Sequence, residues 1–271
     1  MIPTLDGLPS PTARQLLLRL LIAVEGGELE AAEAIRACAL FDISTNNARV
    51  ALNRLMAAGV IENTGRGAYR LRPAGRTLRR DVGAWREAEG RVRPWDGGWV
   101  AVTTGGTRRS DRPAVRAQKR ALAMVGLRQL DDGLFVRPDN FEGGIPLTRQ
   151  RLQALGLDPA IPVFAAAAFD QTLEARARSL WDGRALEHSY DEGCARLAAS
   201  LARCAAMALP DAARESYLLG DQGIRTIVFD PMLPEPLVSV AARQAFVEAV
   251  RRYDETGRRI WRDYLAGVSS S

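Results

Sequence analysis

The sequence contains little that could form a disulfide framework or a metal site. Its three cysteines, Cys38, Cys194 and Cys204, form an odd set without CxxC spacing, and His188 is the only histidine. Neither a disulfide-stabilised fold nor a zinc site is indicated by such a set. We therefore expect buried thiols in a reducing compartment, a structural histidine, and neither a metal nor another resident cofactor.

Long apolar runs are also absent. No stretch approaches the roughly 20 consecutive apolar residues that cross a bilayer, and no basic start followed by an apolar run opens the chain. These absences predict a soluble, cytoplasmic protein without a membrane partner. At 271 residues and 47% hydrophobic content, the chain can bury a large core and is long enough for about two or three domains.

Lysine is nearly missing, since Lys119 is the only one, and arginine carries almost all of the positive charge. The formal net charge of +5 is unevenly spread. Residues 44–80 hold eight arginines and one acid, Glu62, for a local charge of +7, whereas residues 1–43 carry −3. A concentrated cationic segment favours a polyanionic partner such as DNA, and a solvated arginine-rich face is the alternative.

The stretch that begins at Ser44 predicts a helix with two different faces. At about 100° per residue, one face is apolar, with Ala48, Ala51, Leu52, Leu55 and Met56. The other face carries Asn46, Asn47, Arg49, Asn53 and Arg54. Asparagine can pair with adenine and arginine with guanine, while Ser44 and Thr45 at the helix start can reach a phosphate. The polar face is therefore predicted to contact DNA.

A hairpin is predicted directly after this helix. Gly59 is expected to end the helix, and residues 60–63 and 68–71 form two short strands. The turn between them places Arg66 at its tip, and Arg70 lies in the second strand. With two earlier apolar-faced helices, near residues 12–25 and 30–41, these elements predict a winged helix-turn-helix DNA-binding domain in residues 1–80.

The rest of the chain predicts an α+β multidomain protein. Residues 81–93 are predicted as a linker helix, residues 94–170 as a ferredoxin-like domain, and residues 171–271 as a helical C-terminal domain. In the middle domain the predicted strands cover 99–103, 133–136 and 163–169, and the predicted helices cover 111–125 and 148–155.

Four separated motifs resemble the PaaX family of transcriptional repressors. They are, in order, ARVALNRLMAAGVIENTGRGAYRL, RPWDGGWVAV, GLFVRPDN and FDPMLPEPL. The first motif matches the family pattern at Arg49, Arg54, Leu55, Gly59, Gly67 and Tyr69. The family usually places a glycine before the arginine of the turn, where this chain has Gly65-Arg66-Gly67.

The resemblance implies a particular architecture and function. It implies an N-terminal winged helix, a central domain similar in fold to the Cas2 protein, and a mostly helical C-terminal domain. It also implies a homodimer on a palindromic double-stranded DNA operator, released when an aryl-acetyl-CoA thioester such as phenylacetyl-CoA binds as effector.

Three groups of residues are predicted as ligand contacts. A dense basic run contains Arg108, Arg109, Arg112, Arg116, Lys119 and Arg120. This run could clamp the phosphates of a CoA nucleotide, contact a DNA backbone, or form a solvated helix face. Trp95 and Trp99 could stack on a ring or pack within the fold, and His188 and Tyr190 could line a pocket or be structural.

Two enzymatic alternatives remain at the level of the sequence. The Cas2-like resemblance raises a metal-dependent nuclease, but the strand at residues 99–102 runs into Thr103-Thr104-Gly105-Gly106 without an acid. Hydrolysis with a divalent metal needs hard oxygen ligands, so we predict a structural and dimerisation module. The other alternative, an acyl-CoA enzyme with an accessory DNA-binding domain, lacks a recognisable nucleophile and base. We therefore predict that the chain is not an enzyme.

Overall fold

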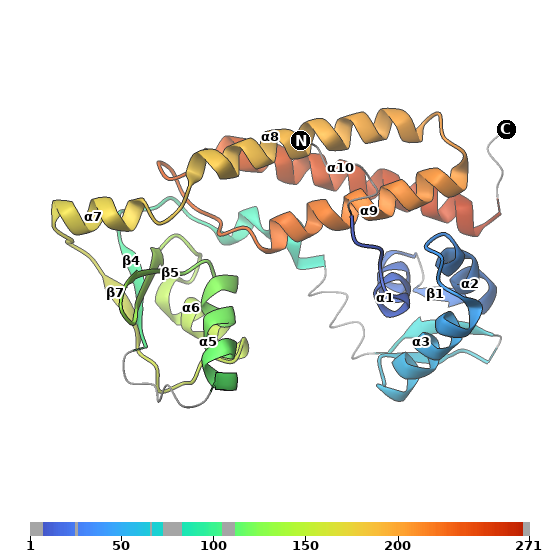
Figure 1. Cartoon of the computed structure of the whole chain (residues 1–271), viewed down its shortest axis with the longest axis horizontal. Coiled ribbons are helices and arrows are strands. Elements are labelled where there is room, and N and C mark those ends of the chain that lie inside the picture. The colour runs from blue at the N-terminus through green and yellow to red at the C-terminus, as the bar shows by residue number, and fades with distance from the viewer. Residues whose placement is uncertain (1–7, 25–26, 66, 73–82, 105–111, 268–271) are drawn as a thin grey trace. The chain divides into compact units, whose positions relative to one another are not determined.

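The computed structural model describes residues 8–24, 27–65, 67–72, 83–104 and 112–267 (Figure 1). It has a mixed α+β fold with a helical C-terminal region, as the sequence predicts. The C-terminal helices are α7 (Gln171–Arg178), α8 (Gly183–Cys204), α9 (Leu209–Val228) and α10 (Val240–Leu265). None of the described helices combines the length and the apolar character that a bilayer span requires.

By compactness the chain divides into two units. Unit 1 contains Met1–Arg86, Glu192–Arg225 and Val247–Ser271, and unit 2 contains Glu87–Asp191 and Thr226–Phe246. The helices α8, α9 and α10 each contribute residues to both units. The division into domains drawn from the sequence stays a prediction.

Unit 1 begins with three helices and a small sheet. Its N-terminal elements are α1 (Ala13–Ala23), β1 (Glu28–Glu30), α2 (Ala31–Ala39), α3 (Thr45–Ala57), β2 (Ile61–Asn63) and β3 (Ala68–Leu71). The strands are antiparallel in the order β1-β3-β2. Thr12 and Gln15 start α1 with a reciprocal capping box, which satisfies two backbone N–H groups at that end.

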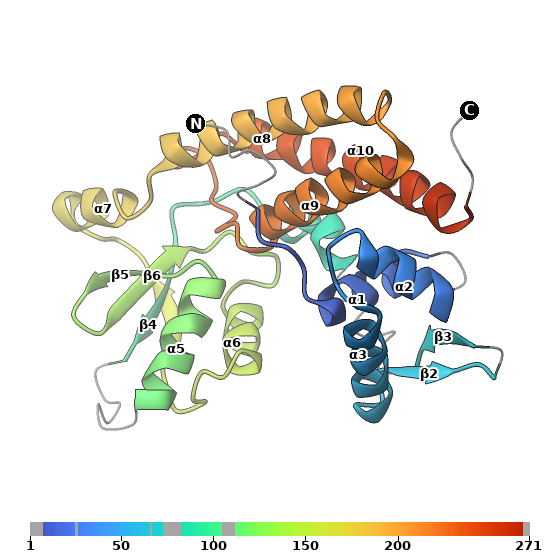
Figure 2. The same cartoon turned by 45° about the vertical axis from the view of Figure 1, so that its right-hand side comes forward.

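One hydrophobic core joins these elements to the C-terminal helices. Leu16 and Leu20 of α1 pack in the same buried cluster as Leu52 and Leu55 of α3. The same cluster contains Ala213 and Leu218 of α9 and Trp261 and Leu265 of α10. The position of α3 therefore depends on α1 and, through this core, on two C-terminal helices (Figures 1 and 2).

Unit 2 contains a four-stranded antiparallel sheet. Its elements are β4 (Trp99–Thr103), α5 (Arg112–Met124), β5 (Arg128–Asp131), β6 (Leu134–Pro138), α6 (Gly144–Ala154) and β7 (Val163–Ala166). The strand order is β5-β6-β4-β7. Figure 2 shows α5 and α6 side by side next to this sheet. Two short 3-10 helices, η2 (Ala84–Glu87) and η3 (Glu89–Arg91), precede β4.

The chain order from β4 to β7 is β-α-β-β-α-β, so the β-α-β-α-β order predicted from the sequence missed one strand. That strand is β5, in which Leu130 is the one buried residue between exposed polar side chains. Its single apolar position gives no alternating pattern, and the strand lies at the edge of the sheet. A short strand of this kind is set by its pairing with β6 rather than by its own sequence.

Candidate nucleic-acid interface

The ends of α3 are set by two local signals that the sequence carries. Ser44 is the N-cap, and its side-chain oxygen accepts a hydrogen bond from the Asn47 backbone N–H at 3.2 Å. Gly59 follows the last turn with a φ of 68°, a left-handed conformation that glycine adopts without strain. The Gly59 N–H donates to the Met56 carbonyl at 2.9 Å. The predicted start and end of this helix are confirmed.

The two faces of α3 differ in exposure. Its buried residues are Ala48, Ala51, Leu52 and Leu55, and Met56 is half-buried. The residues predicted to read DNA are all exposed: Ser44, Thr45, Asn46, Asn47, Arg49, Asn53 and Arg54. The structure therefore gathers seven of the nine predicted DNA contacts on the exposed side of one helix. Amide, hydroxyl and guanidinium groups of this kind form hydrogen bonds with base edges and phosphates in protein–DNA complexes.

The β2–β3 hairpin carries the other two predicted contacts. Its strands pair in the register Ile61 with Leu71 and Asn63 with Tyr69. The Asn63 side chain accepts from the Gly65 N–H at 2.8 Å and so shapes the start of the turn. Arg66, the predicted tip, lies outside the described residues.

Arg70 is exposed but its charge is balanced within the sheet. Its Nε donates to Glu62 Oε1 at 2.6 Å, and its Nη1 lies 4.0 Å from Glu28 Oε1. The Glu62 carboxylate also lies 3.4 Å from Arg72. The hydrogen bond and the charge of Glu62 raise the pKa of Arg70 above its ordinary value. A phosphate would therefore have to compete with Glu62 for the Arg70 guanidinium.

Glu28 belongs to β1, a strand that the sequence analysis did not predict. Its three residues read Glu-Leu-Glu, and only Leu29 is buried. The strand exists because it pairs with β3, about 40 residues further along the chain, with Glu28 opposite Arg70. No local sequence pattern predicts such a pairing. The one usable signal was that an arginine-rich hairpin needs acidic partners, and Glu28 is an acid.

The predicted basic run is only partly within the described residues. Arg108 and Arg109 lie outside them, and so does the side chain of Arg112, the first residue of α5. Arg116, Lys119 and Arg120 are exposed on α5. Their exposure fits each of the three interpretations of this run.

Trp99 has the environment of a packing residue. Its side chain is 1% exposed, and its ring stacks with Phe169 and Trp181 at centroid distances of 6.0 and 6.2 Å. Its Nε1 donates to Glu174 Oε2 at 3.0 Å, and Trp95 packs edge-on against it at 5.1 Å. A ring enclosed in this way offers no face to a ligand. Of the two predicted stacking residues, only the half-buried Trp95 reaches the surface.

His188 and Tyr190 lie on α8 in different environments. His188 is exposed, whereas Tyr190 is buried, donates to Asp230 Oδ2 at 2.5 Å and stacks on Phe246 at 5.8 Å. Burial, and then the charge of Asp230, raise the pKa of the Tyr190 hydroxyl. The Tyr190 hydroxyl is therefore engaged within the fold. The tryptophan pair and Tyr190 contact different residues. Their contacts therefore do not place the predicted ligand residues in one pocket.

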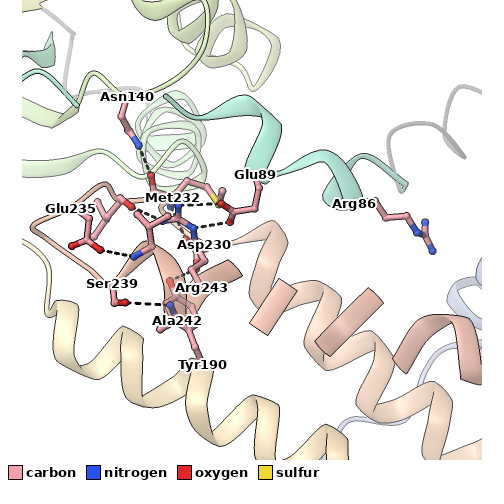
Figure 3. A network of polar contacts seen from close by, with 12 residues as sticks. Arg86, Glu89, Asn140, Tyr190, Asp230, Met232, Glu235, Ser239, Ala242 and Arg243 are labelled. Atoms are coloured by element: carbon pink, nitrogen blue, oxygen red, sulfur yellow. Dashed lines mark hydrogen bonds and ion pairs between the residues drawn. The ribbon is translucent and has the colours of Figure 1, made fainter. Parts of the chain in front are cut away.

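Two of the sequence motifs meet in a buried polar network (Figure 3). Arg137, in the motif GLFVRPDN, is 1% exposed and donates to Asn140 Oδ1 at 2.8 Å. Asn140 donates to the Met232 carbonyl, in the motif FDPMLPEPL, at 2.7 Å. Burial lowers the pKa of Arg137 to about 9. These residues hold a proline-rich loop in place, which gives both motifs a structural role in unit 2.

A second arm of the network holds the start of α10. Arg243 is 1% exposed, and its Nε donates to Glu89 Oε1 at 2.9 Å while its Nη1 donates to the Leu233 carbonyl (Figure 3). The buried guanidinium is thus paired with a carboxylate and hydrogen-bonded, as a buried charge requires. Among the described residues, no three side chains of His, Cys, Asp or Glu gather as a metal ion would need.

The protein therefore has a mixed α+β fold with a helical C-terminal region. Its helix α3 presents exposed amide and guanidinium groups. Residues 181–263 match the model of the PaaX-like protein C-terminal domain, which confirms the predicted relation to the PaaX family. The match falls on α8, α9 and α10.

A solved structure shares its fold with most of the chain. The uncharacterized protein Rv0674 from Mycobacterium tuberculosis superimposes with a TM-score of 0.60 at 22% sequence identity. The alignment covers 91% of this chain and 99% of that one, and at this identity it shows a shared fold. No curated protein matches the sequence.

Proposed function

We propose that this chain is a homodimeric DNA-binding transcriptional repressor without enzymatic activity. The PaaX-like C-terminal domain supports the assignment to a family of regulators. The observation that carries DNA binding is the exposed face of α3, which carries Asn46, Asn47, Arg49, Asn53 and Arg54, while Ala48, Ala51, Leu52 and Leu55 of the same helix are buried. Asparagine and arginine on one exposed helix face are the residues that read adenine and guanine in the major groove.

In this proposal residues 1–80 form a winged helix-turn-helix. Three helices around one core, followed by the β2–β3 hairpin, support that interpretation. The helix α3 enters the major groove of one half-site, with Ser44 and Thr45 near a phosphate at its start. The hairpin, with Arg66 and Arg70, lies over the neighbouring backbone or minor groove.

The middle domain in this proposal is a ferredoxin-like, Cas2-like module that dimerises the protein. The β-α-β-β-α-β order and the antiparallel strand order β5-β6-β4-β7 support it. A dimer places two copies of α3 on a palindromic operator, where the spacing of the half-sites must match the spacing of the helices.

An aryl-acetyl-CoA thioester such as phenylacetyl-CoA is the proposed effector. It would release the repressor by favouring a state in which the two recognition helices no longer match the half-sites. Such an effector must bind the free protein more tightly than the DNA-bound protein, because equal affinities would shift nothing.

The test is fluorescence anisotropy of the full chain on its own upstream DNA, with random DNA of equal length as control. Each titration is repeated across a salt series and in the presence of phenylacetyl-CoA or free CoA. We expect specific, salt-sensitive binding that phenylacetyl-CoA abolishes and free CoA leaves intact. Equal binding to both DNAs would contradict an operator-specific repressor, and binding that ignores phenylacetyl-CoA would contradict the proposed effector.

A further inference from the structure

Unit 1 contains a cavity of about 530 Å³ that no predicted ligand residue lines. Its walls come from α1, α9 and α10, from the segment around Trp85, and from Glu28 of β1 and Glu33 of α2. This volume is within the range of about 300–1,000 Å³ that small-molecule sites occupy in proteins. The cavity lies where the PaaX-like C-terminal helices pack against the helix that supports α3.

Aromatic rings form part of the cavity wall. Tyr217 of α9 and Trp261 of α10 meet edge-to-face at 6.2 Å, and Trp85 lines the same space. The Nε1–H of Trp261 is buried without an acceptor among the described residues. An unpaired buried donor is costly, and an acceptor on a bound molecule would remove that cost. These rings favour a ligand with an aromatic body.

Guanidinium groups line the cavity beside these rings. Arg19 of α1 forms an ion pair with Asp221 of α9, and the two side chains are 24% and 25% exposed. Arg258 of α10 also lines the cavity, and its Nε donates to Asp254 Oδ2 at 2.9 Å. A guanidinium that is already partly desolvated binds a carboxylate or sulfonate through two parallel hydrogen bonds.

Arg19 can exchange Asp221 for the anion of a ligand, because Asp221 has a second partner. Asp221 Oδ1 accepts from Arg19, whereas its Oδ2 accepts from Arg225 Nε at 2.6 Å. If an anion took the Arg19 guanidinium, Asp221 would keep Arg225 as a partner. The exchange therefore does not leave this partly buried carboxylate unpaired, which is the costly outcome in broken buried ion pairs.

A ligand on Arg19 would act directly on the support of the recognition helix. Arg19 is one position before Leu20, which packs in the same core as Leu52 and Leu55 of α3. Residues of α9 and α10 line the same cavity. A molecule bound between these helices would change how α1, and with it α3, is held by the C-terminal helices.

We propose that this cavity binds a small organic anion with an aromatic ring, the anion on Arg19 and the ring against Tyr217 and Trp261, and that its occupancy regulates α3. The regulatory half of this inference rests on the proposed function, whereas the binding half does not. The two halves are therefore tested separately.

The binding test titrates the full chain with anilinonaphthalene sulfonate, an aromatic anion, and with its neutral analogue N-phenylnaphthylamine, following probe fluorescence. Arg19→Gln is expected to weaken the sulfonate about tenfold and to leave the neutral probe unchanged. Arg14→Gln, an exposed arginine on the same helix, is the matched control and should change neither. Circular dichroism of each variant confirms that it is folded.

Asp221→Asn separates ligand binding from a structural role. It removes the negative charge that competes for Arg19 but keeps the guanidinium in place, so the sulfonate should bind as tightly as to the parent chain or more tightly. If Arg19→Gln and Asp221→Asn weaken the sulfonate alike, the pair only holds the helices together and the site is overturned. Equal behaviour of Arg19→Gln and Arg14→Gln overturns it too.

The regulatory test measures operator affinity by anisotropy with and without the sulfonate. We expect the sulfonate to lower the operator affinity of the parent chain and of Arg14→Gln. The fold-decrease in these two proteins should be at least three times that in Arg19→Gln. Arg19-dependent probe binding without any effect on operator affinity overturns the regulatory half. Failure of the parent chain to bind DNA contradicts the proposed function, while an Arg19-dependent probe site would still support the binding half.

Discussion

Arg70 and Glu62 face each other across the β2–β3 hairpin and form an ion pair with an Nε–Oε1 distance of 2.6 Å. The same carboxylate lies 3.4 Å from Arg72, so one acid restrains two arginines on the surface that we propose lies on the DNA backbone. Part of the hydrogen-bonding capacity of these two guanidinium groups is therefore taken up within the sheet.

Removal of this restraint should strengthen binding to any DNA. In Glu62→Gln, Arg70 and Arg72 lose a competing partner, so affinity should rise on operator and random DNA alike, and the salt slope should steepen by about one. Anisotropy on both DNAs across a salt series measures this change. Glu255→Gln, which removes an exposed acid from α10, is the control. An effect confined to the operator would argue against a backbone contact.

The outer face of α3 leads to a prediction of the opposite kind. Arg49→Ala should weaken operator binding by about 1–3 kcal/mol if the guanidinium contacts a guanine through two hydrogen bonds, and random DNA should be much less affected. A competition assay with both DNAs measures the difference. Arg14→Ala, exposed on α1, should change neither. Unchanged operator affinity in Arg49→Ala would remove this residue from the reading face.

The limits of α3 could be predicted because their causes are local. Ser44 caps the helix start through a residue three positions away, and Gly59 takes a positive φ at its end. The two faces between them follow from helical periodicity alone. All the signals that determine the limits and the two faces of this helix lie between Ser44 and Gly59.

Two of the features that the sequence analysis missed depend on distant pairs. The strand β1 exists through pairing with β3, and the Glu28 side chain then lies near Arg70. In the cavity, Arg19 and Asp221 are separated by about 200 positions. Neither pair has a sequence pattern of its own. The pairing of Glu28 with Arg70 and of Asp221 with Arg19 could therefore be found only from the structure.

The packed face of α3 leads to a stability prediction. Leu52 is 1% exposed in the core shared by α1 and α3, so Leu52→Ala should lower the free energy of unfolding by about 2–5 kcal/mol. Val50, on the same helix, is 37% exposed, and Val50→Ala should cost less than about 1 kcal/mol. Urea unfolding followed by circular dichroism compares the two variants. A small loss in Leu52→Ala would mean that the core around α3 is loosely packed.

The buried pair of Tyr190 and Asp230 leads to a prediction about pH. Burial raises the pKa of Asp230, and the hydrogen bond from Tyr190 acts against that rise. In Tyr190→Phe the pKa of Asp230 should therefore rise further, and the ionised carboxylate loses a donor, at a cost of about 1–3 kcal/mol at neutral pH.

The sign of the pH dependence follows from the direction of this shift. A carboxyl group with a raised pKa binds more protons when folded, so the free energy of unfolding falls as pH rises from the ordinary carboxyl pKa through the raised one. The destabilisation by Tyr190→Phe should thus be largest at neutral pH and shrink in acid, where Asp230 is protonated. Urea unfolding of this variant across that window measures the effect, with Asp230→Asn and the double variant as controls. Since Asp230→Asn cannot ionise, adding Tyr190→Phe to it should give a cost independent of pH in the same window, and a pH-dependent cost there would assign the effect to another group.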